Sequence, residues 1–87
     1  MDLESPNNNP DFSRITEVGT PRLKRILAEG ARQAASRGHD FVGVEHVFLA
    51  MLAEGGSVPI QLLGRHLDLD ALRAELSSFL DSYESSR

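Results

Sequence analysis

The chain has 87 residues, of which 40% are hydrophobic and 25% charged, the balance of a small globular domain. Its net charge of −4 at pH 7 argues against a nucleic-acid-binding surface, and the lack of cysteine excludes disulfides and thiol chemistry. No stretch approaches the ~18 apolar residues of a membrane span, and the acidic start of the chain lacks the apolar core of a secretion signal. We therefore expect a cytoplasmic protein with one small core, a size at which oligomerisation adds stability.

The first 19 residues are predicted to form a flexible N-terminal arm. They hold Pro6, Pro10, Gly19 and a run of three asparagines, residue types that interrupt helices and favour turns. The folded part is then expected over residues 20–83, and the polar end at 84–87 is expected to fray.

A first helix is expected to begin at Thr20-Pro21, because a hydroxyl caps a helix start and proline suits the first helical position. Gly38 is a natural stop at its other end. Gly30 lies mid-helix at a cost of about 1 kcal/mol relative to alanine, which indicates close contact with another helix. The apolar stripe of this helix comprises Leu23, Ile26, Leu27, Ala31 and Ala34.

A second helix is expected over about residues 44–53, ending at the pair Gly55-Gly56. It is apolar on nearly every face, which is typical of a helix at the centre of a bundle. The side chains predicted to lie at the centre of the fold are Val47, Phe48, Met51 and Leu52.

Two more helices complete the predicted fold. Ser57 is expected to cap the third, with Ile60, Leu63 and Leu67 facing inward. Asp68 is expected to cap the fourth, whose stripe is Leu69, Leu72, Leu76, Phe79, Leu80 and Tyr83. No alternation of period two marks a strand, so the expected fold class is all-α, a compact four-helix bundle with short connections.

Two segments carry a resemblance to a known family. They are Thr20-Pro21-Arg22-Leu23-Lys24-Arg25-Ile26-Leu27 and Gly38-His39-Asp40-Phe41-Val42-Gly43-Val44-Glu45-His46. They resemble the T-P-R-x-K-R-V-L opening and the G-H-x-[YF]-[VI]-G-T-E-H signature of the Clp N-terminal repeat, and the match covers about residues 20–80. The resemblance implies the small helical module found at the front of the Clp protein-unfolding ATPases ClpA, ClpB and ClpC.

The sequence also departs from that family. Val44 stands where threonine is usual, a change expected to remove a cap worth about 1 kcal/mol, and Gly19 replaces a usual phenylalanine. The family carries two tandem repeats followed by ATPase domains, whereas this sequence shows one repeat and no G-x-x-x-x-G-K-[ST] phosphate loop. We therefore expect a free-standing single repeat that is not an enzyme and holds no cofactor.

The candidate ligand site consists of Thr20, Arg22 and Glu45. A helix start such as Thr20-Pro21-Arg22 offers free backbone N–H groups and a positive dipole end, which attract a phosphate. In the ClpC branch the repeats recognise phosphorylated arginine, and the resemblance implies that Thr20 takes the phosphoryl group and Glu45 the guanidinium. The alternatives are that Thr20 is merely a cap, Glu45 merely a helix-start acid, and the cluster Arg22, Lys24, Arg25 a solvated face.

Other site chemistries are disfavoured by the sequence. His39, Glu45 and His46 lack the spacing of a zinc set, and both histidines are better interpreted as tying the loop to the helix by hydrogen bonds. Ser57 and His66 lack the G-x-S-x-G context of a nucleophile. No metal and no catalytic residue are expected.

The predicted function is a non-enzymatic module that binds proteins or peptides of the Clp degradation machinery. Its expected partners are Clp ATPase subunits, adaptors or substrate proteins, among them phosphoarginine-marked proteins, and it would act as adaptor or decoy in regulating proteolysis. The alternative is a helical dimeric regulatory or structural assembly protein unrelated to Clp proteolysis. A homodimer is expected in either case, since Gly30, Ala31, Ala34 and Ala35 would permit another helix to approach closely.

Overall fold

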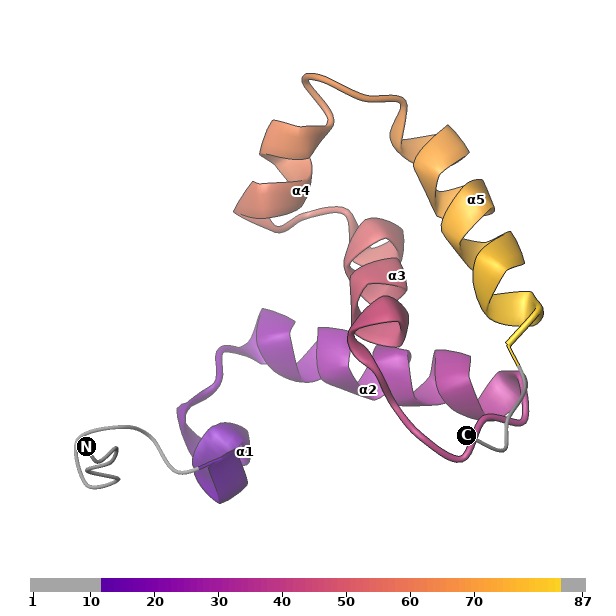
Figure 1. Cartoon of the computed structure of the whole chain (residues 1–87). Helices are drawn as coiled ribbons and strands as arrows, with labels where there is room; N and C mark the ends of the chain where they lie inside the picture. Colours follow the sequence, from indigo (N-terminus) through magenta and orange to yellow (C-terminus); the bar gives the residue numbers. More distant parts are fainter. Residues whose placement is uncertain (1–11, 84–87) are drawn as a thin grey trace, which may run out of the picture.

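The computed structural model describes residues 12–83, which are helical apart from turns and connections and contain no strand (Figure 1). The elements are the 3-10 helix η2 (Phe12–Arg14) and the α-helices α1 (Ile15–Val18), α2 (Pro21–Ser36), α3 (Val44–Glu54), α4 (Val58–Leu63) and α5 (Leu69–Asp81). The all-α prediction and its four helices are confirmed, with one short helix added before them. None of the helices in this range has the length and apolar character that crossing a bilayer requires.

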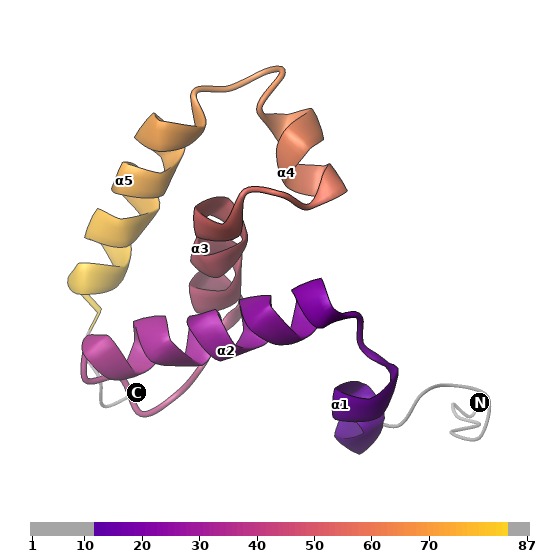
Figure 2. The same ribbon diagram turned by 180° about the vertical axis from the view of Figure 1, so that it is seen from behind.

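The added helix lies in the predicted arm. Residues 12–18 form η2 and α1, joined by an ion pair between Arg14 Nε and Glu17 Oε1 at 3.2 Å, and the N–H of Gly19 closes α1 on the carbonyl of Ile15. The helix α1 buries no side chain and lies beyond the N-terminal end of α2 (Figures 1 and 2). The rest of the predicted arm, residues 1–11, and the predicted frayed end, 84–87, lie outside the described residues.

Local signals set both ends of α2. Thr20 Oγ1 accepts a hydrogen bond from the N–H of Leu23 at 3.1 Å, and Pro21 occupies the first helical position. At the other end Gly38 adopts a left-handed φ of 74°, and the N–H groups of Gly38 and His39 return to the carbonyls of Ala35 and Ala34. This is the Schellman arrangement, which a residue with a side chain adopts only under strain.

The helix α3 is the centre of the fold, packed against α2 on one side and α5 on another (Figures 1 and 2). It lies close to α2 at Gly30, where an added Cβ would lie 3.4 Å from Cα of Val47. The predicted close contact at Gly30 is therefore confirmed. The helices α2, α3, α4 and α5 all contribute buried apolar side chains, which are Ile26, Ala34, Leu49, Ala50, Leu52, Ile60 and Leu80.

The predicted centre of α3 was wrong in its choice of face. Leu52 is buried as expected, but Val47, Phe48 and Met51 are only partly buried. The buried stripe instead holds His46, Leu49 and Ala50, at 0%, 3% and 0% exposure. Both sets follow helical spacing, so the sequence pattern alone does not distinguish the face that meets α2 and α5 from the neighbouring face.

The capping predictions for the last two helices differ in outcome. Asp68 Oδ1 accepts from the N–H of Ala71 at 3.1 Å, as predicted, whereas the Ser57 hydroxyl is buried and hydrogen-bonds no described residue. Ile60 and Leu80 face inward as expected, but Leu67 and Phe79 are about half exposed. Leu67 is exposed because α4 ends at Leu63, so the spacing counted from Ile60 does not extend to it.

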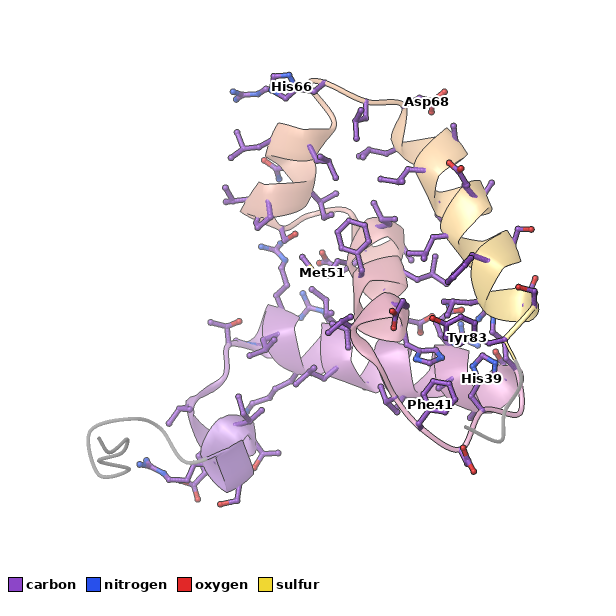
Figure 3. All side chains as sticks on the ribbon, in the orientation of Figure 1. His39, Phe41, Met51, His66, Asp68 and Tyr83 are labelled. Carbon is purple, nitrogen blue, oxygen red and sulfur yellow. The ribbon has the colours of Figure 1, made fainter. Side chains whose placement is uncertain are left out.

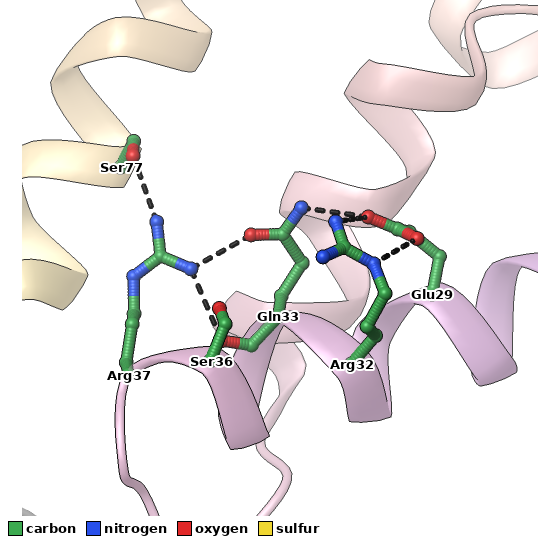
Figure 4. Close-up of polar contacts among 6 residues, drawn as sticks. All are labelled: Glu29, Arg32, Gln33, Ser36, Arg37 and Ser77. Carbon is green, nitrogen blue, oxygen red and sulfur yellow. Dashed lines mark hydrogen bonds and ion pairs between the residues drawn. The ribbon is translucent and has the colours of Figure 1, made fainter.

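Polar contacts tie both ends of α2 to other helices. Arg22 Nε lies 2.9 Å from Glu54 Oε2 at the end of α3, and Arg25 reaches the same oxygen at 3.7 Å. At the C-terminal end Arg37 donates to Asp81 and to Ser77 of α5, each at 2.8 Å. Figure 4 shows Arg37 bridging from Ser77 to the side chain and carbonyl of Gln33, next to the pair of Glu29 and Arg32.

Two neighbours on α3 test the assignment of the core. Leu49→Ala removes a side chain that is 3% exposed and is expected to lower the free energy of unfolding by about 2–5 kcal/mol. Phe48→Ala removes a larger but partly exposed side chain and is expected to cost clearly less. Urea unfolding followed by circular dichroism measures both. A larger loss for Phe48→Ala would place the core on the other face of α3.

The stability of the protein at low pH tests the contribution of the ion pair between Glu54 and Arg22. The backbone N–H of Gly56, and after it the Arg22 guanidinium, lower the pKa of Glu54 below its usual 4.5. A carboxyl with a lowered pKa stabilises the fold above pH 4.5 and loses that contribution as the pH falls further. Glu54→Gln should therefore be less stable than the parent at pH 7, with the difference shrinking at pH 3. The exposed Glu75→Gln serves as control, and a difference of equal size at both pH values would contradict the assignment.

Candidate functional site

An apolar groove of about 860 Å³, open to solvent, lies where α2, α3 and α5 meet. Its size is that of pockets which hold small molecules or peptide segments. We call it the α3 groove. Its lining is apolar except for one carboxylate and consists of Leu27, Val42, Gly43, Val44, Glu45, Val47, Phe48, Met51 and Leu76.

The second apolar face of α3 forms the floor of the groove. Val44, Val47, Phe48 and Met51 recur at helical spacing, and their stripe is offset from the buried one. Val44 is 78% exposed because it is the first helical residue, the N-cap being Gly43. The predicted loss of a side-chain cap at residue 44 was therefore wrong, since that position lies inside the helix and does not cap it.

Glu45 is the charged group of the groove. Its carboxylate lies at the first turn of α3, where the helix dipole favours a negative charge. Among residues 12–83 no arginine, lysine or histidine nitrogen lies within ion-pair distance of it, whereas Glu17, Glu29 and Glu54 each have an arginine partner. Glu45 can therefore accept a cation from a bound molecule at the edge of an apolar surface.

A pair of buried histidines holds the loop before α3. The N–H of Gly43 donates to His46 Nδ1 at 2.8 Å, and His46 Nε2 lies 2.8 Å from His39 Nδ1. His46 is the third residue of α3, so its bond to the N-cap N–H is the return half of a capping box. The predicted structural role of both histidines is confirmed. Burial, followed by the neighbouring His39 and Arg37, lowers the pKa of His46, while Glu45 opposes that effect.

Aromatic rings surround this pair. Phe41 stacks on His39 with ring centroids 5.1 Å apart and meets His46 edge-on at 5.3 Å. Tyr83, just after α5, lies 6.1 Å from His39 and 6.3 Å from Phe41. Figure 3 shows His39, Phe41 and Tyr83 gathered where the loop, the end of α2 and the end of α5 meet. The cluster thus connects the wall of the α3 groove to α5.

The three sequence-predicted site residues are not gathered in one described pocket. Thr20 caps α2 and Arg22 pairs with Glu54, whereas Glu45 lines the α3 groove, which neither of the others lines. Glu54 lies nine positions after Glu45 along α3, a rise of about 13.5 Å at 1.5 Å per residue. Glu45 and the α2 helix start therefore lie toward opposite ends of α3.

Within residues 12–83 no group of three or more histidine, cysteine, aspartate or glutamate side chains has the arrangement of a metal site. The Ser57 hydroxyl makes no hydrogen bond to His66 or to any other described residue.

The sequence prediction missed most of the groove. Val42, Val44 and Leu76 were assigned no binding role, although two of them are exposed valines next to the histidine motif. The available signal was the excess of apolar residues on α3, more than one packed face requires. That excess indicates an uncovered apolar surface on α3, but it does not predict which residues of α2, α5 and the loop line the rest of the groove.

Comparison with known proteins identifies relatives over the part of the chain that contains the groove. The family model of the Clp repeat (R) N-terminal domain matches residues 19–87. The ClpA homolog, an ATP-dependent Clp protease ATP-binding subunit, of Porphyra purpurea is 34% identical over 62 residues, or 70% of this chain and 8% of its own. Chaperone protein ClpB of Oceanobacillus iheyensis is 33% identical over 67 residues, covering 76% of this chain and 8% of its own.

The negative regulator of genetic competence ClpC/MecB of Bacillus subtilis is 31% identical over 67 residues, again 76% of this chain and 8% of its own. The chain thus spans about 8% of the length of these relatives. No solved structure matches significantly.

Proposed function

The chain belongs to the Clp repeat N-terminal domain family, and from that premise we propose that it is a non-enzymatic module that binds segments of other proteins. The observation that carries the proposal is the α3 groove, an open apolar surface with one carboxylate, that of Glu45, at its edge. Apolar surface of this kind on a small domain is usually covered by a partner.

The groove favours a particular kind of segment. Phe48, Met51 and Val47 offer contact to apolar side chains, and methionine adapts to partners of varied shape. Glu45 at the edge adds a site for one arginine or lysine. We therefore propose that the bound segment is a short apolar stretch carrying a single basic residue, as exposed by unfolded or damaged proteins.

The names of the relatives support the proposal that this binding serves Clp machines. Two of them are named as the ATP-binding subunit of a protease and as a chaperone. We propose that this chain acts as adaptor or decoy toward such machines by holding segments of their substrates. Addition of the purified chain to a Clp degradation assay should change the rate of substrate loss, and the direction of the change separates adaptor from decoy.

Phosphoarginine is a second proposed ligand. Glu45 supports it because its carboxylate, which has no ion-pair partner among residues 12–83, suits the guanidinium, and Thr20 supports it because the start of α2 suits a phosphoryl group. The distance between these groups means that one chain offers them as two separate contacts, so a phosphoarginine ligand would use Glu45 or the α2 start.

Two valines that begin helices provide a matched test of the groove. Val44→Asp places a charge on the groove, whereas Val58→Asp makes the same change at the first residue of α4, outside it. The probe is a fluorescent peptide of leucine and phenylalanine around a central arginine, measured by anisotropy. Val44→Asp should weaken binding about tenfold or more, equivalent to about 1.4 kcal/mol, and Val58→Asp should not.

The mass of the chain in solution separates this proposal from the dimeric alternative. Light scattering should give 9.5 kDa for the parent if its groove is free. Twice that mass for the parent, reduced to the monomer by Val44→Asp, would show that a second copy occupies the groove. Equal peptide affinity of the two aspartate variants would contradict the groove as binding site.

Titration calorimetry with free phosphoarginine tests the second ligand. If Glu45 holds the guanidinium, Glu45→Gln should weaken binding about tenfold, and the exposed Glu75→Gln should leave it unchanged. Loss of binding in Thr20→Ala alone would place the ligand at the start of α2. No heat of binding with the parent, or equal affinity of the parent and all variants, would contradict phosphoarginine as a ligand of these residues.

A further inference from the structure

We propose that His39 and His46 form a pH-sensitive latch on the α3 groove, in which one proton added to either ring breaks a hydrogen bond that fixes the groove wall at Gly43. The latch itself is a property of the fold. Its consequence for ligands, a loss of affinity in mild acid, rests on the proposed peptide-binding function.

The hydrogen-bond chain has room for only one arrangement of protons. The N–H of Gly43 points at His46 Nδ1, so that nitrogen must be an acceptor without a proton. A neutral His46 then carries its proton on Nε2 and donates it to His39 Nδ1 at 2.8 Å. His39 Nδ1 is therefore also an acceptor, and both rings must be neutral.

A proton on either ring destroys this order. On His46 it would occupy Nδ1 and face the N–H of Gly43, donor against donor. On His39 it would occupy Nδ1 and face the Nε2–H of His46, again donor against donor. Since both rings are buried, at 8% and 0% exposure, water cannot readily replace the lost partner. One proton therefore forces the rings apart.

The charged groups around the two histidines do not, taken together, stabilise a protonated ring. Arg37 at the end of α2 is positive and repels it, while Glu45 on α3 attracts it. Asp81 on α5 is already paired with Arg37 at 2.8 Å. From the loop Asp40 is exposed, and Tyr83, just after α5, lies 6.1 Å from His39. Burial and Arg37 thus act together against the charged rings, with Glu45 opposing them.

The histidine pair is connected to the groove through the backbone of Gly43. Gly43 is both the N-cap that His46 holds and a residue of the groove lining, and it lies between Val42 and Val44, which also line the groove. Release of its N–H frees this wall at the N-terminal turn of α3. The stacked ring of Phe41 would move with His39 and loosen the contact to Tyr83.

The sign of the pH dependence follows from the lowered pKa of His46. An unfolded histidine gains its proton near the usual 6.5, whereas His46 in the fold resists it to lower pH. Stability therefore falls as the pH drops below 6.5, a range distinct from that of the carboxyl groups.

The test uses the whole chain and two readouts over pH 7.5 to 5. Nuclear magnetic resonance follows the ring protons of both histidines and the amide of Gly43, and anisotropy follows the arginine-containing peptide described above. In the parent, the Gly43 amide should move with the same midpoint as the rings, and peptide affinity should fall several-fold toward pH 5.

Variants separate the latch from a general acid effect. His46→Gln keeps an acceptor for Gly43 that cannot gain a proton. A proton on the remaining His39 can then break only the contact between His39 and the Gln side chain, so the Gly43 amide and the affinity should change much less with pH than in the parent. His66→Gln removes an exposed histidine outside the pair and should behave as the parent. If His46→Gln does not fold, the pH titration of the Gly43 amide in the parent still tests the latch.

A Gly43 amide that stays still while the rings titrate would overturn the latch. So would peptide affinity in the parent that is equal at pH 7.5 and pH 5, and that result would leave the peptide-binding function standing. Coupled titration of the rings and Gly43, together with no peptide binding at any pH, would support the latch and remove the proposed function.

Discussion

The fold depends on one constraint: α3 is eleven residues long and apolar on nearly every face, and too few elements surround it to cover all of them. The helices α2 and α5 pack on it, and its residues His46, Leu49 and Ala50 are buried. The stripe that begins at Val44 is left as the floor of a groove. The core and the floor of the candidate site are therefore two faces of the same helix, and Leu27 of α2 and Leu76 of α5 complete the lining.

Much of the fold was predictable because its signals are local. The hydroxyl of Thr20, the carboxylate of Asp68 and the glycine at 38 each act within a few residues, and each behaves as its type suggests. The family resemblance was likewise readable from contiguous motifs, and the family match confirms it. The helix α1 was missed because Ile15–Val18 is too short to show periodicity and follows a stretch rich in turn residues.

The choice between the two faces of α3 was not predictable, because Phe48 and Leu49 are both apolar and both fit a helical stripe. Only the direction from which α2 and α5 approach decides which is covered, and that direction depends on contacts such as Gly30 with Val47. The histidine pair was predicted as structural, but its proton order depends on where Gly43 points its N–H, which no sequence pattern gives. The separation of Thr20 from Glu45 is likewise a three-dimensional fact.

The short helix α4 has a consequence for how the molecule opens. It has six residues, begins after Gly55-Gly56, ends at Gly64, and buries a single side chain, that of Ile60. Its contacts with the other helices are sparse compared with those between α2 and α3. Segments of this kind unfold locally at a lower free energy than the whole domain. The chain from Gly55 to Leu67 should therefore open as a separate unit while α2, α3 and α5 stay together, so that a protease reaches the peptide bonds around α4 before those within these three helices.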